Sequence, residues 1–313
     1  ADPSAVDRAA LLAKADLLTQ MVGEFPELQG TMGRYYALAD GEDVQVAEAI
    51  EQHYRPRFAG DQVPAHTSAM ALALADKMET LAGLFGIGQL PTGDKDPFAL
   101  RRHALGTLRI LIECRLPATL SVLVSGAFSV FPPGMLGNGN AHAELEMFLF
   151  ERLRGYLRDA GYFANEIEAV LCLRPMRIDQ VPQQLAAVRA FAQLPEAESL
   201  ASANKRVANI LKQAEARGEA NLPAEEAMLR EKAERDLFAA LKAASARATP
   251  LLQQGDFSGY LTTFAALKSP VDAFFDSVMV MVEDAALRHN RLALLRDLRG
   301  EMNRIADISK LAA

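Results

Sequence analysis

The chain of 313 residues is half apolar and 23% charged, and its formal net charge is −7. These proportions are typical of a globular protein with a full hydrophobic core, and the length favours two domains. They exclude a disordered chain. The acidic balance argues against a protein that coats DNA, although a local basic surface can still bind RNA phosphates. No apolar run reaches the ~18 residues that a membrane-spanning helix needs, so we expect no membrane partner.

The two cysteines, Cys114 and Cys172, lie in apolar surroundings. We expect them to be free thiols in a reducing, cytoplasmic compartment rather than a disulfide. The charged, amphipathic residues 1–16 do not resemble a secretory signal. A chain that starts with Ala1 instead of methionine suggests a part of a longer polypeptide.

Helical periodicity runs through almost the whole chain, and no segment alternates as a strand would, so we expect an all-α fold. Residues 6–25 predict one amphipathic helix. Its expected buried face consists of Leu11, Leu12, Ala15, Leu18, Met21 and Val22. Residues 68–87 are apolar all round and predict a helix in a domain interior. Asp96 and Pro97 predict the N-cap and first residue of a helix that reaches residue 113.

Proline and glycine interrupt this pattern in three places. Residues 131–140 predict a surface loop, and further breaks fall within 174–195 and 216–227. We therefore expect one domain over 1–195 and a second over 196–313.

Two short segments, 12–21 and 73–81, resemble the helical HD phosphohydrolase domain. In that family a His-Asp dipeptide and a later Asp bind a divalent metal that activates water. Here Ala15 and Asp16 stand at the dipeptide and Asp76 matches the later Asp, so the imidazole ligand is missing. The resemblance implies the fold with its catalysis lost, and hence no metal and no catalytic residue. An active metal-dependent phosphohydrolase is the alternative.

Polar and basic residues gather on one predicted helix, 202–214. Asn204, Lys205, Arg206 and Asn209 face away from its apolar stripe. Such a cluster is usually a solvated face, but it can also grip phosphates and read unstacked bases.

Residues 284–295, DAALRHNRLALL, resemble the DALR motif of an anticodon-binding helical bundle, with one extra alanine after Asp284. Arginines are frequent from there to the end of the chain and predict a basic stripe in an acidic protein. They are Arg288, Arg291, Arg296, Arg299 and Arg304.

Several longer segments, among them GDKDPFALRR, resemble the beta subunit of the bacterial two-subunit glycyl-tRNA synthetase. They are residues 16–37, 54–64, 73–88, 93–102, 203–211, 271–295 and 306–311. Residues 121–146 depart most from the family pattern. The resemblance implies the C-terminal half of that subunit: a degenerate HD-like domain with connecting helices, followed by a DALR-like anticodon-binding bundle.

The family also implies function and partners. Its α₂β₂ enzyme binds glycine, ATP and Mg at the alpha subunit, and the beta subunit recognises glycine tRNA. We therefore expect tRNA and the alpha subunit as partners, no DNA, no cofactor in this chain and no catalysis by it alone. The second alternative is a helical module that only docks the alpha subunit and binds no RNA.

The same resemblance implies two groups of tRNA-binding residues. The group expected at the anticodon arm is Asn204, Lys205, Arg206, Asn209, Arg288, Asn290 and Arg291. The group expected to contact phosphates nearer the acceptor end is Arg101, Arg102 and Arg109.

Overall fold

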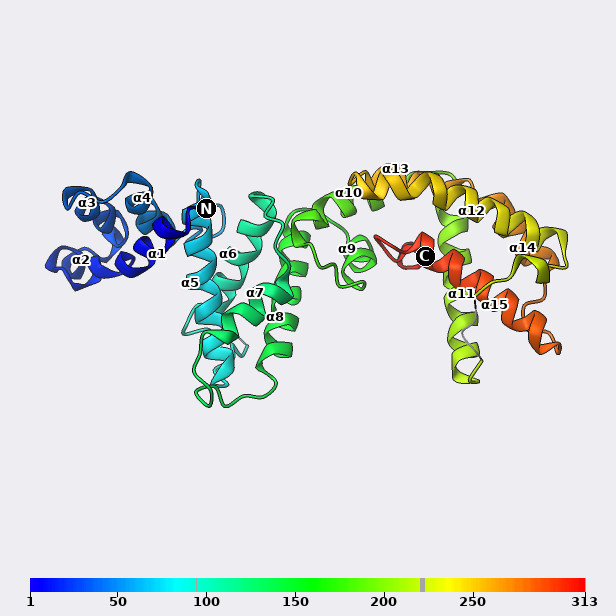
Figure 1. Ribbon diagram of the computed structural model, residues 1–313, viewed down its shortest axis with the longest axis horizontal. Helices are drawn as coiled ribbons and strands as arrows, with labels where there is room; N and C mark the ends of the chain where they lie inside the picture. The colour runs from blue at the N-terminus through cyan, green and yellow to red at the C-terminus, as the bar shows by residue number, and fades with distance from the viewer. Residues whose placement is uncertain (94, 220–222, 313) are drawn as a thin grey trace. The chain divides into compact units, whose positions relative to one another are not determined.

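The computed structural model describes residues 1–93, 95–219 and 223–312, and these residues form helices joined by short loops (Figure 1). Within these ranges there is no strand, only two isolated bridges, Thr92–Lys95 and Thr119–Arg177. The predicted all-α class is therefore confirmed. No helix in the described part of the chain has the length and apolarity to cross a bilayer.

The chain divides into two compact units. The first comprises Ala1–Tyr156 with Met176–Gln180, and the second comprises Leu157–Pro175 with Val181–Ala313. The domain boundary predicted between residues 195 and 196 stays a prediction. The predicted loop at 131–140 is confirmed as the connection between two helices, and part of the break predicted at 216–227 lies outside the described residues.

Helix α5 is the centre of the first unit and packs against α1, α4, α6 and α7. Its residues Leu72, Met78, Leu81 and Phe85 are buried, which confirms the predicted interior helix. The helices of this unit are α1 (Pro3–Leu12), α2 (Gln20–Glu24), α3 (Thr31–Ala39), α4 (Val44–Gln52), α5 (Thr67–Gly86), α6 (Leu100–Glu113), α7 (Leu120–Ser129) and α8 (Ala141–Asp159), whose last residues belong to the second unit.

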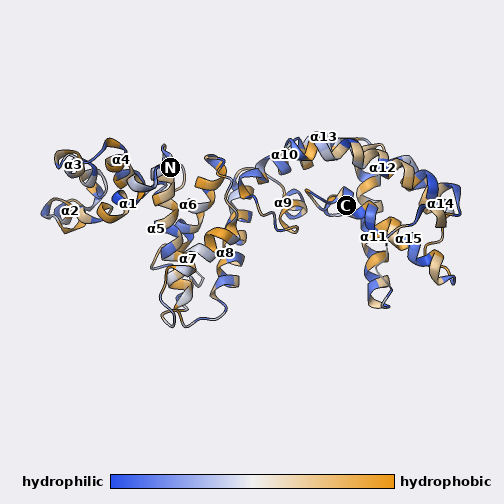
Figure 2. Ribbon diagram, in the orientation of Figure 1, coloured by the Kyte–Doolittle hydropathy of each residue, from blue (hydrophilic) through white to orange (hydrophobic). Residues whose placement is uncertain are grey.

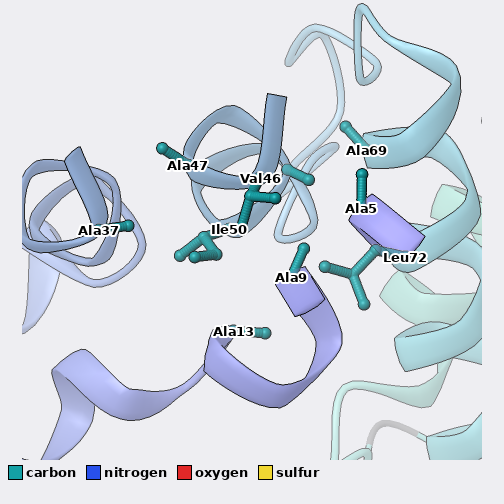
Figure 3. Close-up of a cluster of buried hydrophobic side chains, with 10 residues drawn as sticks. Ala5, Ala9, Ala13, Ala37, Val46, Ala47, Ile50, Ala69 and Leu72 are labelled. Carbon is teal, nitrogen blue, oxygen red and sulfur yellow. The ribbon is translucent and has the colours of Figure 1, made fainter. Parts of the chain in front are cut away.

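Helices α1 and α4 meet α5, and α3 packs on α4, through a cluster of mostly small side chains (Figure 3). Methyl groups let helix backbones approach closely while still excluding water. The buried residues of this alanine cluster are Ala5, Ala9, Ala13, Ala37, Val46, Ala47, Ala49, Ile50, Ala69 and Leu72.

The single helix predicted over residues 6–25 is wrong. Helix α1 ends at Leu12, a 3-10 turn follows at Ala15–Leu18, and α2 starts at Gln20. The Asp16 side chain turns inward and accepts hydrogen bonds from the Gly30 and Gly33 amides at 2.6 and 3.1 Å. These partners lie beyond the segment, so its own periodicity could not reveal them. Of the expected buried face, Leu11 and Leu18 are 75% and 91% exposed.

Helix α6 begins at Leu100, three residues after the predicted start at Pro97. Asp96 still caps it, because its carboxylate accepts from the Leu100 and Arg101 amides at 2.8 and 2.9 Å. Ala99, at φ 54°, turns the chain between the cap and the helix.

In the second unit, helix α12 packs against α13 and α14, α10 packs against α13, and α11 packs against α15. Each of these helices carries both hydrophobic and hydrophilic residues (Figure 2). The aromatic side chains of Tyr260, Phe264 and Phe274 are fully buried in the core of this unit. The helices of this unit are α9 (Ala164–Leu171), α10 (Val181–Ala192), α11 (Ala197–Ala216), α12 (Lys232–Gln253), α13 (Phe257–Ala265), α14 (Lys268–Ser277) and α15 (Ala285–Met302).

Candidate nucleic-acid interface

Helix α11 exposes part of the predicted polar cluster. Lys205, Arg206 and Asn209 are exposed, and the Arg206 guanidinium lies 4.3 Å from the centre of the Phe275 ring. Lys212 is exposed as well. It follows Lys205 and Asn209 at the i, i+4, i+7 spacing of one helix face. Sequence reasoning missed Lys212, although this spacing could have identified it.

Asn204, in contrast, lies inside the second unit and is 2% exposed. Its side-chain amide donates to Asn303 Oδ1 at 2.6 Å, and Asn303 Nδ2 donates back to Asn204 Oδ1 at 3.2 Å. Asn303 is the C-cap residue of α15, so this amide pair ties α11 to the end of α15. The contact gives Asn204 a structural role, and its part in tRNA binding stays a prediction.

Arg291 is also buried, and it forms an ion pair with Glu234. Its Nη1 donates to the Met279 carbonyl at 2.7 Å. The second carboxylate oxygen of Glu234 accepts from the Arg230 and Glu231 amides at 2.6 and 2.8 Å, at the start of α12. The guanidinium is therefore occupied by interactions that hold α15, α12 and residue 279 together.

Arg288 and His289 share one carboxylate, that of Glu219. Arg288 Nε donates to Glu219 Oε1 at 2.7 Å, and the His289 ring nitrogen Nε2 lies 2.5 Å from Glu219 Oε2. The hydrogen bond from Arg288 is the main reason why the pKa of Glu219 is lowered, with a smaller contribution from His289. Arg288 also donates to the Val282 carbonyl at 2.6 Å.

Asn290 is 4% exposed and binds a backbone segment through its amide. Its Oδ1 accepts from the Glu225 amide at 2.6 Å, and its Nδ2 donates to the Glu225 carbonyl at 3.1 Å. Like Asn204 and Arg291, Asn290 thus has a structural role here, and its binding to tRNA stays a prediction.

Asp284 begins α15 as its N-cap and accepts from the Leu287 amide at 3.1 Å. This hydrogen bond is the main cause of its lowered pKa. The acid of the DALR-like segment therefore stabilises the start of α15, and the two alanines that follow it are the first two residues of the helix.

The other arginines of the predicted basic stripe also lie near acids. Arg299 is 3.9 Å from Asp307, and Arg304 is 3.8 Å from Glu301. Arg296 and Arg299 line a hollow of about 240 Å³ together with Glu219 of the loop after α11. These acids reduce the positive charge that the sequence predicts for α15.

In the first unit, the three predicted arginines line one hollow of about 300 Å³ beside Pro56. Arg109 is held there by Glu113 at 2.6 Å and by the Asp61 carbonyl, also at 2.6 Å. Arg101 donates to the Gly93 carbonyl. Arg102 is exposed, and its guanidinium has no hydrogen bond or ion pair with other described residues. The structure thus brings the three together, and Arg102 keeps its guanidinium available.

The residues at the degenerate HD positions line two of the hollows in the first unit. Ala15 and Asp16 line a hollow of about 280 Å³. Asp76 lines a different one and pairs with Lys14 at 2.6 Å. Among residues 1–93, 95–219 and 223–312, no group of three or more His, Cys, Asp or Glu side chains is placed to hold a metal ion.

Around Asp76 the structure gathers polar residues that sequence reasoning did not select. His53 and Lys77 are buried, and the ammonium of Lys77 donates to the His53 carbonyl at 3.0 Å. Lys77 sits among the apolar residues of α5, and that charged position on a buried helix is the signal that could have identified this region.

Comparisons with known proteins found two family profiles that match different parts of the chain. A family profile described as glycyl-tRNA synthetase beta subunit matches residues 2–172, and one described as DALR anticodon binding domain matches residues 200–308. Proteins named glycine–tRNA ligase beta subunit are similar over nearly the whole chain. The protein from Thiobacillus denitrificans is 63% identical over 98% of this chain, and that from Nitrosomonas europaea is 57% identical over 98%.

The chain spans less than half the length of these relatives, 43% and 44% respectively. The first family profile covers more than half of the 313 residues, and the second covers the helices that carry the DALR-like segment. The chain therefore belongs to the glycyl-tRNA synthetase beta subunit family.

Proposed function

We propose that this chain is the tRNA-recognition part of a glycine–tRNA ligase and binds the anticodon arm of glycine tRNA through its second unit. The observation that carries the proposal is the DALR anticodon binding domain matched over 200–308, which contains the exposed Lys205, Arg206, Asn209 and Lys212. Basic and amide side chains on an exposed helix can bind phosphates and the edges of unstacked bases.

The exposed face of α11 is the main contact surface in this proposal. Arg206 stacks on Phe275, which holds its guanidinium in place without neutralising it. Arg288 and Arg291 are bound to Glu219 and Glu234, so they support the domain in the free state.

The enzyme as a whole would use ATP and Mg at the alpha subunit and act as an α₂β₂ assembly. This chain would contribute tRNA binding in the cytoplasm without catalysing a step itself. Cys114 and Cys172 are free thiols, as a reducing compartment favours.

The test is fluorescence anisotropy with glycine tRNA and with a transcript altered only at the second and third anticodon bases. Preference for the unaltered tRNA supports anticodon recognition. Equal binding of both transcripts would contradict it, and no binding at all would favour a docking role.

The residues are tested by R206A and by the pair K205A and K212A. Each lost phosphate contact should weaken binding and reduce the salt slope of log affinity by about 1. R247A is the matched control, because Arg247 is an exposed arginine on α12 of the same unit. Equal effects of R206A and R247A would remove α11 from the proposal.

A further inference from the structure

A hollow of about 370 Å³ in the first unit is lined by Arg102 and by the Lys14–Asp76 pair, and it does not depend on the proposed anticodon surface. Its volume is in the range of small-molecule sites. The residues of this polar hollow that matter are Lys14, Tyr54, Arg57, Asp76, Arg102 and His103.

The charge around the polar hollow is positive. Lys14, Arg57 and Arg102 line it, and Asp76 is the acid among its lining residues. The Lys14 ammonium lies 2.6 Å from Asp76 and neutralises that carboxylate. The Arg57 guanidinium donates through one nitrogen to the Gln29 carbonyl at 3.0 Å, and the Arg102 guanidinium has no hydrogen bond or ion pair within the described ranges. Both guanidinium groups therefore have N–H donors to offer.

Two further lining residues have polar atoms without a partner among the described residues, the Tyr54 hydroxyl and His103 Nδ1. A buried polar atom that makes no hydrogen bond costs free energy, so both atoms are available to a hydrogen-bonding group that enters the hollow, whether water or a ligand. Burial raises the pKa of Tyr54 to about 12, so its hydroxyl is a donor at neutral pH.

Burial is the main reason why the pKa of His103 is lowered; the charge of Lys77 lowers it further, Asp76 opposes this, and Lys14 and Arg102 contribute less. The imidazole is therefore neutral at about pH 7.5, and its Nδ1 can donate a hydrogen bond as the Nδ1–H tautomer.

We propose that the polar hollow binds a phosphomonoester, with Arg57 and Arg102 holding the phosphate and Tyr54 and His103 donating hydrogen bonds to it. Guanidinium groups match a tetrahedral oxyanion through paired N–H donors. The volume beyond the phosphate leaves room for an attached group such as a nucleoside.

The test is calorimetric titration of the whole chain with inorganic phosphate and with AMP, at about pH 7.5, where a phosphomonoester is mostly a dianion. Sodium chloride at equal ionic strength serves as the blank. We expect saturable binding of AMP, weakened at least about tenfold by R102Q and by R57Q, because each removes charge-assisted hydrogen bonds. R115Q is the matched control, since Arg115 is an exposed arginine just beyond the end of the same helix α6.

An independent readout comes from the ring protons of the five histidines in NMR spectra. AMP should shift the His103 signal, assigned by its loss in H103Q, and leave that of His66 unchanged. The absence of saturable binding up to about 10 mM, which would nearly fill a millimolar site, overturns the proposal. Equal affinity in R102Q, R57Q and R115Q overturns it as well.

Two sources could supply this phosphate, a free nucleotide or the 5′ end of an RNA, and competition distinguishes them. If AMP displaces tRNA that carries a 5′-phosphate but not the dephosphorylated tRNA, the hollow takes the RNA terminus. If AMP binds without affecting either tRNA, the hollow takes a free phosphomonoester. Direct binding of AMP stays measurable in the α11 variants even if they no longer bind tRNA, because α11 belongs to the other unit.

Discussion

Glu234 and Arg291 form an ion pair in the interior of the second unit, where their side chains are 0% and 6% exposed. The pair joins the first turn of α12 to the middle of α15. Glu234 also caps its own helix through the Arg230 and Glu231 amides. An arginine that the sequence places in an RNA-binding stripe is thus a structural residue in the free protein.

Removal of one member of this pair should strongly destabilise the second unit. R291L leaves the Glu234 carboxylate buried without its counter-charge, and such losses are typically ~3–5 kcal/mol. Denaturant unfolding followed by circular dichroism measures the change. The control is K232A, which removes an exposed pair with Asp236 on the same helix and should cost less than ~1 kcal/mol. Similar decreases in the free energy of unfolding in R291L and K232A would contradict a larger contribution from the buried pair.

Substitutions of Asn204 and Asn209 should have different effects, the first on stability and the second on tRNA binding. N204A removes both hydrogen bonds between the buried Asn204 and the half-buried Asn303 and should lower the free energy of unfolding by ~1–3 kcal/mol. N209A alters an exposed position and should leave stability within ~0.5 kcal/mol while weakening tRNA binding. Unfolding and anisotropy titrations on both variants check this. A stable N204A with reduced tRNA affinity would instead make Asn204 a binding residue.

Lys77 should make the first unit more stable as the pH rises from about 8 to about 10. Burial lowers the pKa of Lys77 to about 8 from an ordinary 10.5, against the opposing charges of Asp76 and Asp61. Between these two pKa values the unfolded chain binds more protons than the folded one, so the free energy of unfolding increases with pH, by at most ~3 kcal/mol. Unfolding curves of the unaltered chain and of K77M across this range measure the effect. If the free energy of unfolding of K77M rises equally with pH, the pH dependence comes from a group other than Lys77.

Gly106 should resist even a single added methyl group. A Cβ at this position would lie 2.8 Å from Cε and 3.1 Å from Cδ of Lys77, which is itself buried and cannot easily move. G106A should therefore lower stability by ~1–3 kcal/mol despite the better helix propensity of alanine. G126A, at an exposed position of α7 with no atom within 4 Å, should raise it by ~0.5–1 kcal/mol. Thermal unfolding of both variants gives the comparison, and a stabilised G106A would contradict the steric argument.

Local pattern predicted those features that depend on neighbouring residues. The all-α class, the interior helix α5 and the cap at Asp96 follow from composition, periodicity and capping chemistry within a few positions. Helix α6 starts three residues after the position that Asp96 and Pro97 predict, because the left-handed turn at Ala99 has no signal in the sequence.

Features that depend on distant partners could not be predicted in this way. The break after Leu12 follows from bonds between Asp16 and two glycine amides. Arg288 and Arg291 find acids that lie 69 and 57 positions away in the chain. A count of arginines near the end of the chain therefore overstates the positive charge that an RNA would meet. Of the four α11 residues predicted to face outward, Lys205, Arg206 and Asn209 are exposed, and the prediction is wrong for Asn204, which is buried against Asn303.

The alanine cluster of the first unit has a consequence for how this sequence can change over evolutionary time. At Ala9, Ala47 and Ala69 the side chain is fully buried where α1, α4 and α5 meet, so a larger residue would push two helices apart. Glycine would loosen the helix that carries it. An enlarged side chain on one helix is therefore acceptable only when its neighbour on another helix shrinks at the same time, and these positions should vary as coupled pairs across relatives.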